Sequence, residues 1–517
     1  MDAAVIDRRQ RFSTGDTTGG PTKGTPLMKK TALALAAVAM LAACGGSDDS
    51  SDVTTGSESP EATDAPAGTD ATETTEGTAT TEATNAATAD GVLAVPEEFD
   101  TIQGAVDAAS PGDLVLISPG VYHEAVNVTT DEITIRGLDR NEVVLDGEFE
   151  LDNGVRVLGA SGVAVENLTA QNYTNNGLFW TAVDGYRASY ITAYRNGDYG
   201  VYAFDSVNGL FEHSYASGSP DAGFYIGQCF ECNAVMDDVI SEYNGLGYSG
   251  TTSGGNLYII NSRFNNNRAG INVNSATYEL CYPQRQTTIV GNTVYDNNQP
   301  DTPAIDDAIL AMNNGILVEG GIGNVIERNL VYGHDKVGIG LIPFPEFEPN
   351  DVEPAEDTWE LPCSETRDLP LADPADIEAI VWKPMNNRVV GNVTEDNGVA
   401  DIALSALTTD LAIIDPTTLG NCFGDNVYTT SAPTALEAIV PCEGESSGAD
   451  HTLGDLGIVS WLADMETAPP SVDYATAPTP APTVLEGMPD AATAPAKPAT
   501  NMPPKVDITT IVVPTRS

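Results

Sequence analysis

The chain has few basic residues. Only 22 Lys and Arg oppose 75 Asp and Glu in 517 residues, so the formal net charge is −53. Because neutralisation of phosphates by Lys and Arg supplies most of the affinity for nucleic acids, this composition excludes a nucleic-acid partner. Histidine is scarcer still, with four in the whole chain, and this leaves little to complete a zinc site.

One apolar stretch follows a short basic one near the N-terminus, in "MKKTALALAAVAMLAAC" from Met28. It is too short to cross a bilayer and ends in small residues, which is typical of a secretory signal. We expect residues 1–27 to lie before the true start and residues 28–43 to be the signal peptide. The run "LAAC" resembles the lipobox of bacterial lipoproteins. That resemblance implies cleavage before Cys44, lipid on its thiol, and an extracytoplasmic protein held at the bacterial cell membrane through that lipid alone.

Two long segments have little apolar surface to bury. Residues 44–90 are rich in Thr, Ala, Ser and acids and contain no Lys or Arg, and residues 443–517 carry runs such as "ATAPTPAPT". Such compositions cannot offset the entropy lost on ordering. We expect residues 44–90 to be a disordered tether, residues 443–517 to be mostly disordered, and residues 91–442 to be the folded domain.

Glycine recurs at a fixed interval within that domain. The steps between successive Gly residues that precede an apolar strand start are 23, 23, 23, 24 and 23, and a later pair is again 23 apart. The members of this series are Gly154, Gly177, Gly200, Gly223, Gly247 and Gly270, followed by Gly315 and Gly338. A fixed period in the twenties is typical of a solenoid, in which each repeat stacks on its neighbours.

The residues within each repeat indicate strands. Apolar and polar positions alternate after the Gly in "GLFWT", "GVYAF" and "GFYIG", which predicts a short strand with one buried face. A second strand-like run, such as "LYIINSRF" or "NRVVGNVTE", precedes the next Gly. No repeat has a helical period, and this argues against leucine-rich and all-helical arrays.

On these repeats the chain resembles the right-handed parallel β-helix, or pectin-lyase-like, family over residues 92–440. The best match is "EEFDTIQGAVDAASPGDLVLISPGVYHEAVNV", in which "TIQGAVDAA" corresponds to the amphipathic helix that caps the first coil in that family. The resemblance implies an all-β fold, a right-handed single-stranded parallel β-helix with an N-terminal helical cap. A cap covers the core and strand edges that an open solenoid end exposes.

An Asn follows the apolar pair in several of the second strand-like runs. These residues are Asn261, Asn292, Asn329 and Asn392. Their recurrence indicates an internal turn ladder, in which side-chain amides satisfy turn backbone groups. We interpret them as structural residues rather than as a site.

Three insertions enlarge the repeats: residues 274–287, residues 299–313 and a large acidic segment from Pro343. Insertions in a solenoid usually project from one face, often the binding face. The first and the third follow the same kind of strand, so we expect them to leave the β-helix at the same corner.

Six cysteines remain besides Cys44, and an even number in an exported domain favours disulfides among about 15 pairings. We predict the pairs Cys229–Cys232, Cys281–Cys363 and Cys422–Cys442. We predict the pair Cys281–Cys363 because these residues lie in two insertions that leave the same corner two coils apart. The rival interpretation of "CFEC" is a thioredoxin-like redox pair or half of a zinc site. The sequence around it lacks the βαβ context of a thioredoxin-like pair, and few His residues could complete a zinc site.

Residues at equal offsets from the repeat Gly stack in rows with a spacing of about 4.8 Å. Two residues after the Gly, where alternation points side chains outward, stand Phe179, Tyr202 and Tyr225. Two residues before it stand Asp198 and Asp221. Flat aromatic faces beside carboxylates suit sugar rings, and because two carboxylates about 5 Å apart repel each other, the pKa of one should rise.

This layout predicts a sugar site. Asp198 and Asp221 would share the catalytic acid and base roles, Phe179, Tyr202 and Tyr225 would bind sugar rings, and Arg268, two coils beyond Asp221, would attract an acidic sugar. The competing interpretation is that a loop covers the aromatic side chains and that the acids are solvated or hold an adventitious Ca²⁺. No other cofactor and no metal are expected.

The catalytic patterns of the family transfer only in part. The paired acids and Gly-His-Gly of polygalacturonase-like hydrolases are missing, and "NGDYGVYAFDSVNGLFEHS" loosely resembles the Tyr-Gly, Asp and His cluster of alginate-type epimerases. His213 and Asp205 in that stretch are second-rank candidates, and His123, His334 and His451 are assigned no role. We expect a protein that binds a polysaccharide or cell-surface glycan and processes it as a lyase, epimerase or hydrolase. The alternative is a non-catalytic surface β-helix that binds glycans or proteins.

Overall fold

The computed structural model describes residues 91–347, 349–350, 352–366, 369, 379–405, 415–451, 456 and 467–516. The predicted signal peptide, Cys44 and the predicted tether lie outside these residues. Within the described ranges no helix has both the length and the apolar character needed to cross a membrane.

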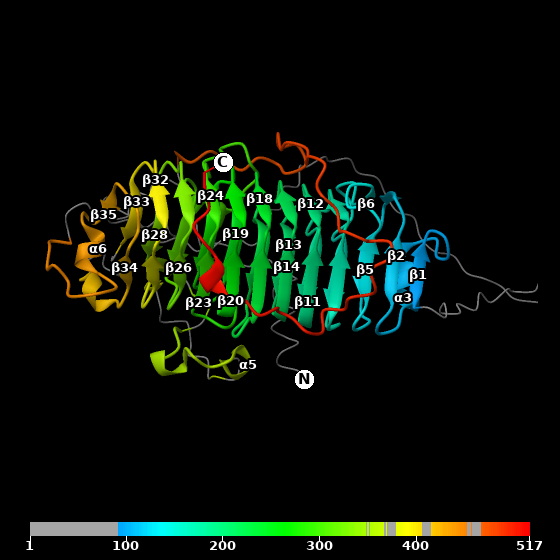
Figure 1. Ribbon diagram of the computed structural model, residues 1–517, viewed down its shortest axis with the longest axis horizontal. Helices are drawn as coiled ribbons and strands as arrows, with labels where there is room; N and C mark the ends of the chain where they lie inside the picture. Colours follow the sequence, from blue (N-terminus) through cyan, green and yellow to red (C-terminus); the bar gives the residue numbers. More distant parts are fainter. Residues whose placement is uncertain are drawn as a thin grey trace, which may run out of the picture.

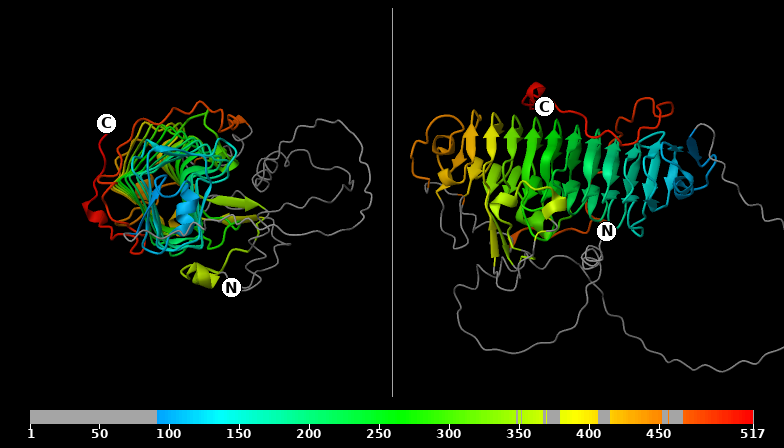
Figure 2. Two further views of the ribbon diagram at one scale, coloured as in Figure 1. Left: turned by 90° about the vertical axis from the view of Figure 1, so that its right-hand side faces the viewer. Right: turned by 90° about the horizontal axis from the view of Figure 1, so that it is seen from below.

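The folded body is a right-handed parallel β-helix, as the family resemblance implied (Figures 1 and 2). Each coil passes through three parallel sheets in the order C, A, B. Each strand inside a sheet pairs with its counterparts in the coils before and after it, and the strands at the sheet ends pair on one side. In sheet C, for example, Phe179 pairs with Tyr202 and Tyr202 with Tyr225. The rows deduced from the glycine interval are therefore real columns of neighbouring side chains.

The strands are short and similar in length within each sheet. Sheet A contains β1 (Val92–Val95), β2 (Leu114–Ile117), β5 (Thr134–Gly137), β8 (Val163–Glu166), β11 (Asp184–Ser189), β14 (Val207–Glu212), β17 (Ala234–Asp237), β20 (Gly254–Ile260), β23 (Arg285–Val290), β26 (Val325–Glu327), β31 (Arg388–Val390) and β34 (Cys422–Gly424). Sheet B contains β3 (Gly120–Tyr122), β6 (Val143–Asp146), β9 (Thr169–Gln171), β12 (Thr192–Tyr194), β15 (Tyr215–Ser217), β18 (Ile240–Glu242), β21 (Arg263–Asn265), β24 (Thr293–Tyr295), β27 (Leu330–Tyr332) and β32 (Val393–Glu395). Sheet C contains β4 (Val126–Val128), β7 (Val155–Leu158), β10 (Leu178–Thr181), β13 (Tyr199–Phe204), β16 (Ala222–Gly227), β19 (Leu246–Thr251), β22 (Ala269–Asn274), β25 (Ile316–Glu319), β28 (Val337–Ile342), β33 (Ala400–Leu404) and β35 (Ser431–Ala432).

Each of the second strand-like runs is in fact two strands. In "LYIINSRF" the chain leaves β20 and enters β21 through Asn261, whose φ of 49° lies in the left-handed region. Asn reaches this region at lower cost than most residues. The corner between sheets A and B was not predicted because a single left-handed residue leaves the apolar pattern unbroken.

The repeat glycines are required by close packing of the coils. A Cβ built on Gly154 would lie 2.5 Å from the carbonyl oxygen of Gly177, and one built on Gly177 would lie 2.6 Å from that of Gly200. Both distances are below any real van der Waals contact, and the obstacle is backbone, which cannot move aside. The interval therefore belongs to the fold: each coil has a Gly where the next coil's backbone approaches.

An asparagine ladder runs along the corner between sheets A and B. Asn329 accepts hydrogen bonds at Oδ1 from the backbone N of Asn292 at 3.0 Å and donates from Nδ2 to the Oδ1 of Asn392 at 3.0 Å. Asn392 continues the ladder to Asn426. Asn261 is not a member, because it stands one residue too early and donates to Asp237 on the surface; Ser262 occupies the ladder position instead.

Both ends of the β-helix are covered. Helix α3 (Ile102–Ala108) caps the first coil, as predicted, with the Thr101 side chain accepting a hydrogen bond from the Gly104 N at 3.0 Å and with Ile102 and Val106 buried in the core. At the other end helix α6 (Leu436–Ile439) packs against β34. This helix has only one turn, so the sequence shows no helical period there and the helix was not predicted.

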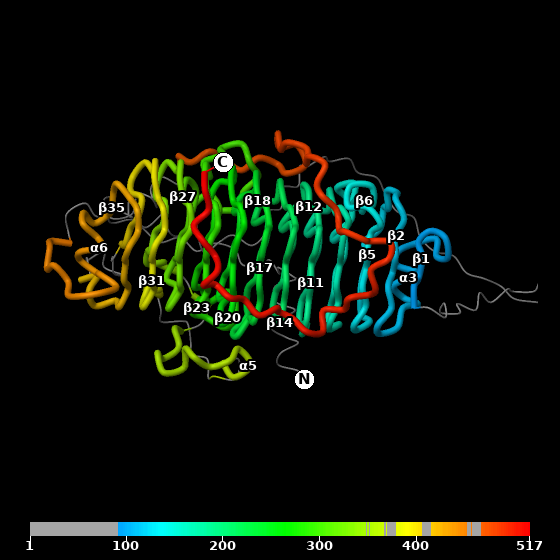
Figure 3. The backbone as a smooth tube through the Cα atoms, viewed as in Figure 1, coloured from blue at the N-terminus to red at the C-terminus, as the bar shows by residue number. Residues whose placement is uncertain are grey.

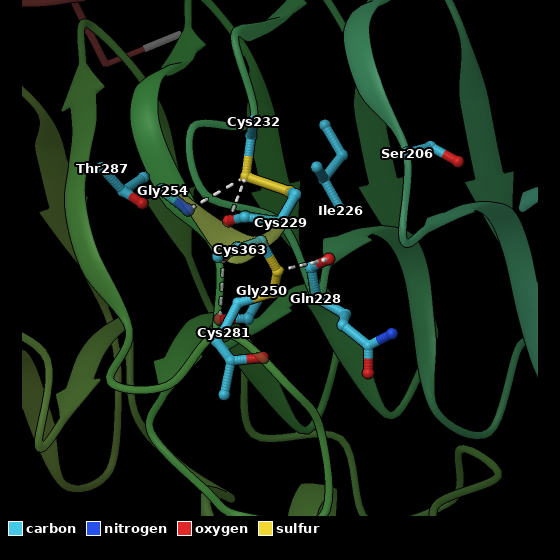
Figure 4. Close-up of a disulfide and its surroundings, with 12 residues drawn as sticks. Ser206, Ile226, Gln228, Cys229, Cys232, Gly250, Gly254, Cys281, Thr287 and Cys363 are labelled. Atoms are coloured by element: carbon cyan, nitrogen blue, oxygen red, sulfur yellow. Dashed lines mark hydrogen bonds between the residues drawn. A yellow bond between two sulfur atoms is a disulfide. The ribbon is translucent and has the colours of Figure 1, made fainter. Parts of the chain in front are cut away.

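The cysteine pairs are those predicted: Cys229–Cys232, Cys281–Cys363 and Cys422–Cys442. Figure 4 shows the first two side by side. The Cys229–Cys232 bond is buried in the core, and the Cys232 Sγ accepts a hydrogen bond from the Gly254 N at 3.0 Å. Its burial in the core favours the structural interpretation of "CFEC" over redox or zinc use.

The insertions at residues 274–287 and after Ile342 both follow strands of sheet C, β22 and β28, and so leave at one corner, as expected. The later one leaves through β29 (Phe344–Phe347) and returns through β30 (Ala379–Trp382), and these two strands pair antiparallel. Beyond β29 it includes a one-turn 3₁₀ helix (Glu356–Thr358) and helix α5 (Cys363–Thr366). Cys363 fastens it to Cys281 of the earlier insertion, with Cα atoms 4.9 Å apart.

Residues 467–516 correct the expectation of a mostly disordered tail. They form a strap that runs over sheet B toward the N-terminal coils and returns over sheet A, as the orange and red tube in Figure 3 shows. Arginines of the β-helix hold its backbone: Arg195 donates to the Ala477 carbonyl at 2.5 Å, and Arg136 to the Ala494 carbonyl at 2.6 Å. A proline-rich chain cannot build a core of its own, but it loses little entropy when it docks on a preformed surface.

The strap also covers an apolar strip on the outer face of sheet A. The strip consists of Leu210, Val235, Ile260 and Val290, one residue from each of four successive coils, and all are buried. Met502, Val506 and Ile511 of the strap pack on it. Outward apolar residues on a solenoid imply a covering segment, and this signal was present in the sequence but not used.

The corrected ladder predicts unequal effects of asparagine substitutions. Asn329→Ala should lower the free energy of unfolding by about 3 kcal/mol, because it leaves several buried backbone and amide groups unsatisfied. Asn261→Gly should cost less than about 1 kcal/mol, since Gly tolerates the positive φ and the lost bond is exposed. Urea denaturation compares the two; equal losses would contradict the ladder assignment.

Candidate functional site

The predicted aromatic row lies on the outer face of sheet C. In β10, Leu178 and Trp180 point into the core and are fully buried, while Phe179 between them points outward. Its ring stacks on that of Tyr202, with centroids 4.8 Å apart and planes inclined by 16°. The Tyr199 ring also stacks on the Tyr202 ring, with centroids 4.2 Å apart and planes inclined by 6°. These rings form a continuous aromatic surface over two coils.

Tyr225 is not part of an open platform. Its side chain is 1% exposed, and its hydroxyl donates to the carboxylate of Glu279 in the insertion at residues 274–287. The prediction of a three-ring platform is wrong at this position, because the insertion that leaves sheet C two coils later folds back over the ring. Phe179 and Tyr202 remain half-buried, so the platform consists of these two rings.

The second cover is helix α4 (Asp306–Leu310) in the insertion at residues 299–313. The backbone N of Ile305 donates to the Pro220 carbonyl at 3.1 Å, and Ala308 packs with Ala222 and Leu246 on the outer face of sheet C. The described part of the large acidic insertion packs beside this cover, where Phe344 and Trp382 cluster with Leu310 of α4. It is also joined to the insertion at residues 274–287 by its disulfide to Cys281 and by hydrogen bonds from Thr277 to Glu346. The C-terminal half of sheet C is thus covered, and the strands before Tyr225 are left more open.

Asp198 and Asp221 lie on successive coils, as predicted. The backbone N of Asp221 donates to the carbonyl of Asp198 at 3.2 Å. Burial raises the pKa of Asp198 to about 6. The pKa of Asp221, which is 8% exposed, rises well above its usual value, chiefly through burial and then through the charge of Asp198, while a hydrogen bond from Tyr199 opposes the rise.

Three further carboxyls border the same face and were missed. Burial raises the pKa of Glu279 to about 8, and the same cause raises that of Asp307 in α4 to about 6. Burial also raises the pKa of Glu319 to about 8, with Asp307 adding to the rise. Glu279 and Asp307 lie in insertions without periodicity. Glu319 pairs with Asn274 in sheet C and could have been found by extending the grid.

These carboxyls provide proton donors near neutrality on one face. Buried and mutually repelling groups hold protons that solvated carboxyls would release. Among the described residues, no three His, Cys, Asp or Glu side chains are grouped in a way that could hold a metal ion. The raised pKa values suit these carboxyls to proton exchange near neutrality.

Arg268 is not placed to attract a substrate. Its side chain is 0% exposed, and its guanidinium donates to the backbone carbonyls of Pro300 at 3.0 Å and Pro469 at 2.6 Å. The prediction that it meets an acidic sugar is wrong, because the insertion and the strap enclose it.

Arg156 is the outward-facing cation of the aromatic row, and the sequence reasoning missed it. It pairs with Phe179 in sheet C, is half-buried, and has an Nε atom that is shielded from solvent without a hydrogen-bond acceptor in the described part of the chain. The signal was present in the sequence: Arg156 stands two residues after Gly154, in the same row as Phe179.

The second-rank candidates are not brought together. Asp205 follows β13 at the corner between sheets C and A, and His213 follows β14 at the corner between sheets A and B. The six-residue strand between them separates them by roughly 20 Å. His213 instead contacts Asp238, with Nδ1 and Oδ2 2.7 Å apart, and stacks beside Tyr190.

The remaining histidines, which were assigned no role, are again assigned none. His334 is buried in a turn, and burial lowers its pKa to about 4. His123 is exposed beside Glu148 at the N-terminal end.

Comparison with known proteins supports the fold. Residues 176–342 match a family model described as right handed beta helix region. The chain is a parallel β-helix protein. A search of curated proteins gives no match.

Several solved β-helix structures resemble the chain at low identity. The A-module of mannuronan C-5 epimerase AlgE4 from Azotobacter vinelandii aligns at 15% identity over 65% of this chain and 92% of that one, with a TM-score of 0.39. An alginate lyase from Paenibacillus aligns at 15% identity over 46% and 87%, with a TM-score of 0.32. The catalytic domain of a GH87 α-1,3-glucanase aligns at 11% identity over 70% and 68%, with a TM-score of 0.41.

The raised carboxyl pKa values predict that stability falls as pH rises. The folded protein keeps protons on these groups that the unfolded chain releases near pH 4, so their contribution is fully present below about pH 4 and is lost as the pH rises through about 6 for Asp198 and about 8 for Glu279. One such carboxyl contributes a slope of up to about 1.4 kcal/mol per pH unit.

Urea denaturation between pH 5 and pH 8 measures this slope. Glu279→Gln stays neutral throughout and should flatten it, whereas Glu231→Gln, at an exposed position, should leave it unchanged. The assignment is wrong if both variants keep the slope of the natural chain.

Proposed function

We propose that the outer face of sheet C around Phe179 and Tyr202 binds a polysaccharide and that Asp198 and Asp221 exchange protons with it. One observation carries the proposal: a stacked pair of outward rings lies beside two carboxyls on successive coils, both with raised pKa values. Because these rings stack on one another, they offer mainly their edges as apolar area on which a sugar ring can pack. Packing of the β-helix requires neither the rings nor the acids.

The acid pair suits breakage or rearrangement of a glycan by general acid and base catalysis. The protonated member donates to the departing oxygen while the ionised member accepts a proton or attacks, so the two roles need different pKa values. Successive coils are about 4.8 Å apart, close to the separation of about 5–5.5 Å between the carboxyls of retaining glycosidases. Hydrolases use such a pair, and lyase and epimerase chemistry likewise needs one group that takes a proton and one that gives a proton.

Arg156, rather than Arg268, is the residue that we expect to attract an acidic sugar. It stands one coil before Phe179 and two before Tyr202, roughly 10 Å from the coil of Asp198. At that distance it meets the neighbouring sugar of a bound chain rather than the reacting one. In a protein with a net charge of −53, a local cation is needed if that sugar is acidic.

The location of the protein follows from its predicted signal. We propose that lipid on Cys44 holds the β-helix at the outside of a bacterial cell membrane, where polysaccharides are within reach. Cys44→Ser should abolish membrane partitioning and labelling by a fatty acid analogue in cells. A Cys44→Ser protein that still partitions into membranes would refute the anchor.

Substitutions in the platform and in the acid pair should separate binding from turnover. Tyr202→Ala should weaken glycan binding by about 1–2 kcal/mol, because it removes part of this apolar area. Asp198→Asn and Asp221→Asn should leave binding within about 0.5 kcal/mol and abolish product formation. Binding is measured by calorimetry and turnover by product analysis against a panel of neutral and acidic polysaccharides.

Tyr295→Ala provides the matched control, because Tyr295 stacks on Tyr332 on the outer face of sheet B with centroids 5.0 Å apart. It should not affect glycan binding. Binding without turnover in the natural chain favours the non-catalytic alternative, and binding that survives Tyr202→Ala unchanged contradicts the platform.

A further inference from the structure

Arg268 joins two segments that lie far apart in the sequence. Its Nη2 donates to the carbonyls of Pro300 at 3.0 Å and Thr302 at 2.9 Å, both in the insertion that carries α4. The same guanidinium donates to the carbonyls of Pro469 at 2.6 Å and Pro470 at 2.8 Å, at the start of the strap. All of these acceptors are neutral, so without the strap part of a buried cation would be left without partners, which is costly.

The first residues of the strap also touch the site directly. The Ser471 Oγ accepts a hydrogen bond from the Ala304 N at 2.9 Å, two residues before α4 begins. The Tyr474 ring lies against Gly197, where an added Cβ would come within 3.0 Å of it. Gly197 directly precedes Asp198. The strap therefore contacts both the insertion that covers Asp221 and the turn that carries Asp198.

Helix α4 in turn determines the surroundings of the acid pair. It is anchored where Ile305 donates to the carbonyl of Pro220, the residue before Asp221. The charge of Asp307 in α4 adds to the raised pKa of Asp221. The insertion that carries this cover is attached to both Arg268 and Ser471.

We propose that the docked C-terminal strap, acting through Arg268, positions α4 over the acid pair, so that the site is complete only after residues 469–474 at the start of the strap have bound to the β-helix. Arg268 is then a positioning residue rather than a substrate ligand. The proposal rests on the function proposed above for Asp198 and Asp221, but the docking that it describes can be measured without a substrate.

The other end of the strap offers a matched control. Arg328 donates from Nε to the Ile511 carbonyl at 2.8 Å and from Nη2 to the Ile508 carbonyl at 2.7 Å, in the 3₁₀ turn at Ile508–Thr510. The chemistry is the same as at Arg268, but Arg328 has no contact with the insertion at residues 299–313 in the described part of the chain. Loss of Arg328 should loosen the strap without moving α4.

Hydrogen exchange of the full-length chain tests the proposal. Arg268→Gln should raise exchange in peptides covering residues 299–313 and 196–222 by about tenfold or more, because the cover opens locally. Arg328→Gln should raise exchange near residues 508–511 and leave those peptides unchanged. Equal effects of the two variants on residues 299–313, or no effect of Arg268→Gln there, would overturn the proposal.

Two further variants cover the case in which Arg268→Gln does not fold. Ser471→Ala removes one tie to the insertion and should raise exchange in residues 299–313 alone. A chain ending at Glu466 should raise it in residues 299–313 and 196–222 together. If the shortened chain protects both segments as well as the full one does, the strap does not position them.

Measurements of activity distinguish a failure of this proposal from a failure of the proposed function. With a substrate from the panel, Arg268→Gln should lower kcat and shift the pH profile while KM stays within about threefold, and Arg328→Gln should leave all three unchanged. If the natural chain turns over no polysaccharide, the proposed function fails, and the exchange result by itself decides whether the strap positions α4.

Discussion

The hydrogen-bonded stacking of one coil on the next is the constraint on which the rest of the structure depends. Parallel pairing at about 4.8 Å brings residues 23 apart in the sequence into direct contact, and it does so in all three sheets. The approach is so close that Gly is required where one backbone crosses the next. The asparagine ladder follows from the same stacking, because each turn offers its backbone N to the side chain of the turn above.

A stacked solenoid has a weakness that the strap counters. Each coil contacts only its neighbours, so the stability of the array is a sum of nearest-neighbour terms and the coils can open locally. The strap contacts the coil of Arg136 near one end and that of Glu395 near the other. It thereby couples coils that share no direct interface. Its carbonyls accept hydrogen bonds from five arginines of the β-helix: Arg136, Arg140, Arg195, Arg268 and Arg328.

The same acidity affects the candidate site. A chain with a net charge of −53 can bury carboxyls beneath its insertions only where they keep their protons, as the raised pKa values of Glu279 and Asp307 indicate. Burial and the charge of neighbouring carboxyls raise the pKa values of the acids on this face. The insertions therefore have two effects: they remove Tyr225 from the platform and they change the protonation of the acids beside it.

The sequence by itself determined the periodic part of this protein. The glycine interval, the alternation after each Gly and the capping helix predicted the coils, the row of Phe179 and Tyr202, and the adjacency of Asp198 and Asp221. These predictions succeeded because one repeat length sets every neighbour within the β-helix. The two cysteine-bearing insertions were also matched correctly, since their positions in the repeat place them at one corner.

Only the tertiary structure decided which parts of the rows stay open. Tyr225 meets Glu279, 54 residues later, and Arg136 meets the strap about 355 residues later. No period relates such partners. Composition predicted a disordered tail because the tail has no core of its own, yet arginines already placed by the β-helix bind its carbonyls. Arg268 changed from a predicted ligand to a buried tie for the same reason: segments that follow no repeat fold back over a surface that the repeat had prepared.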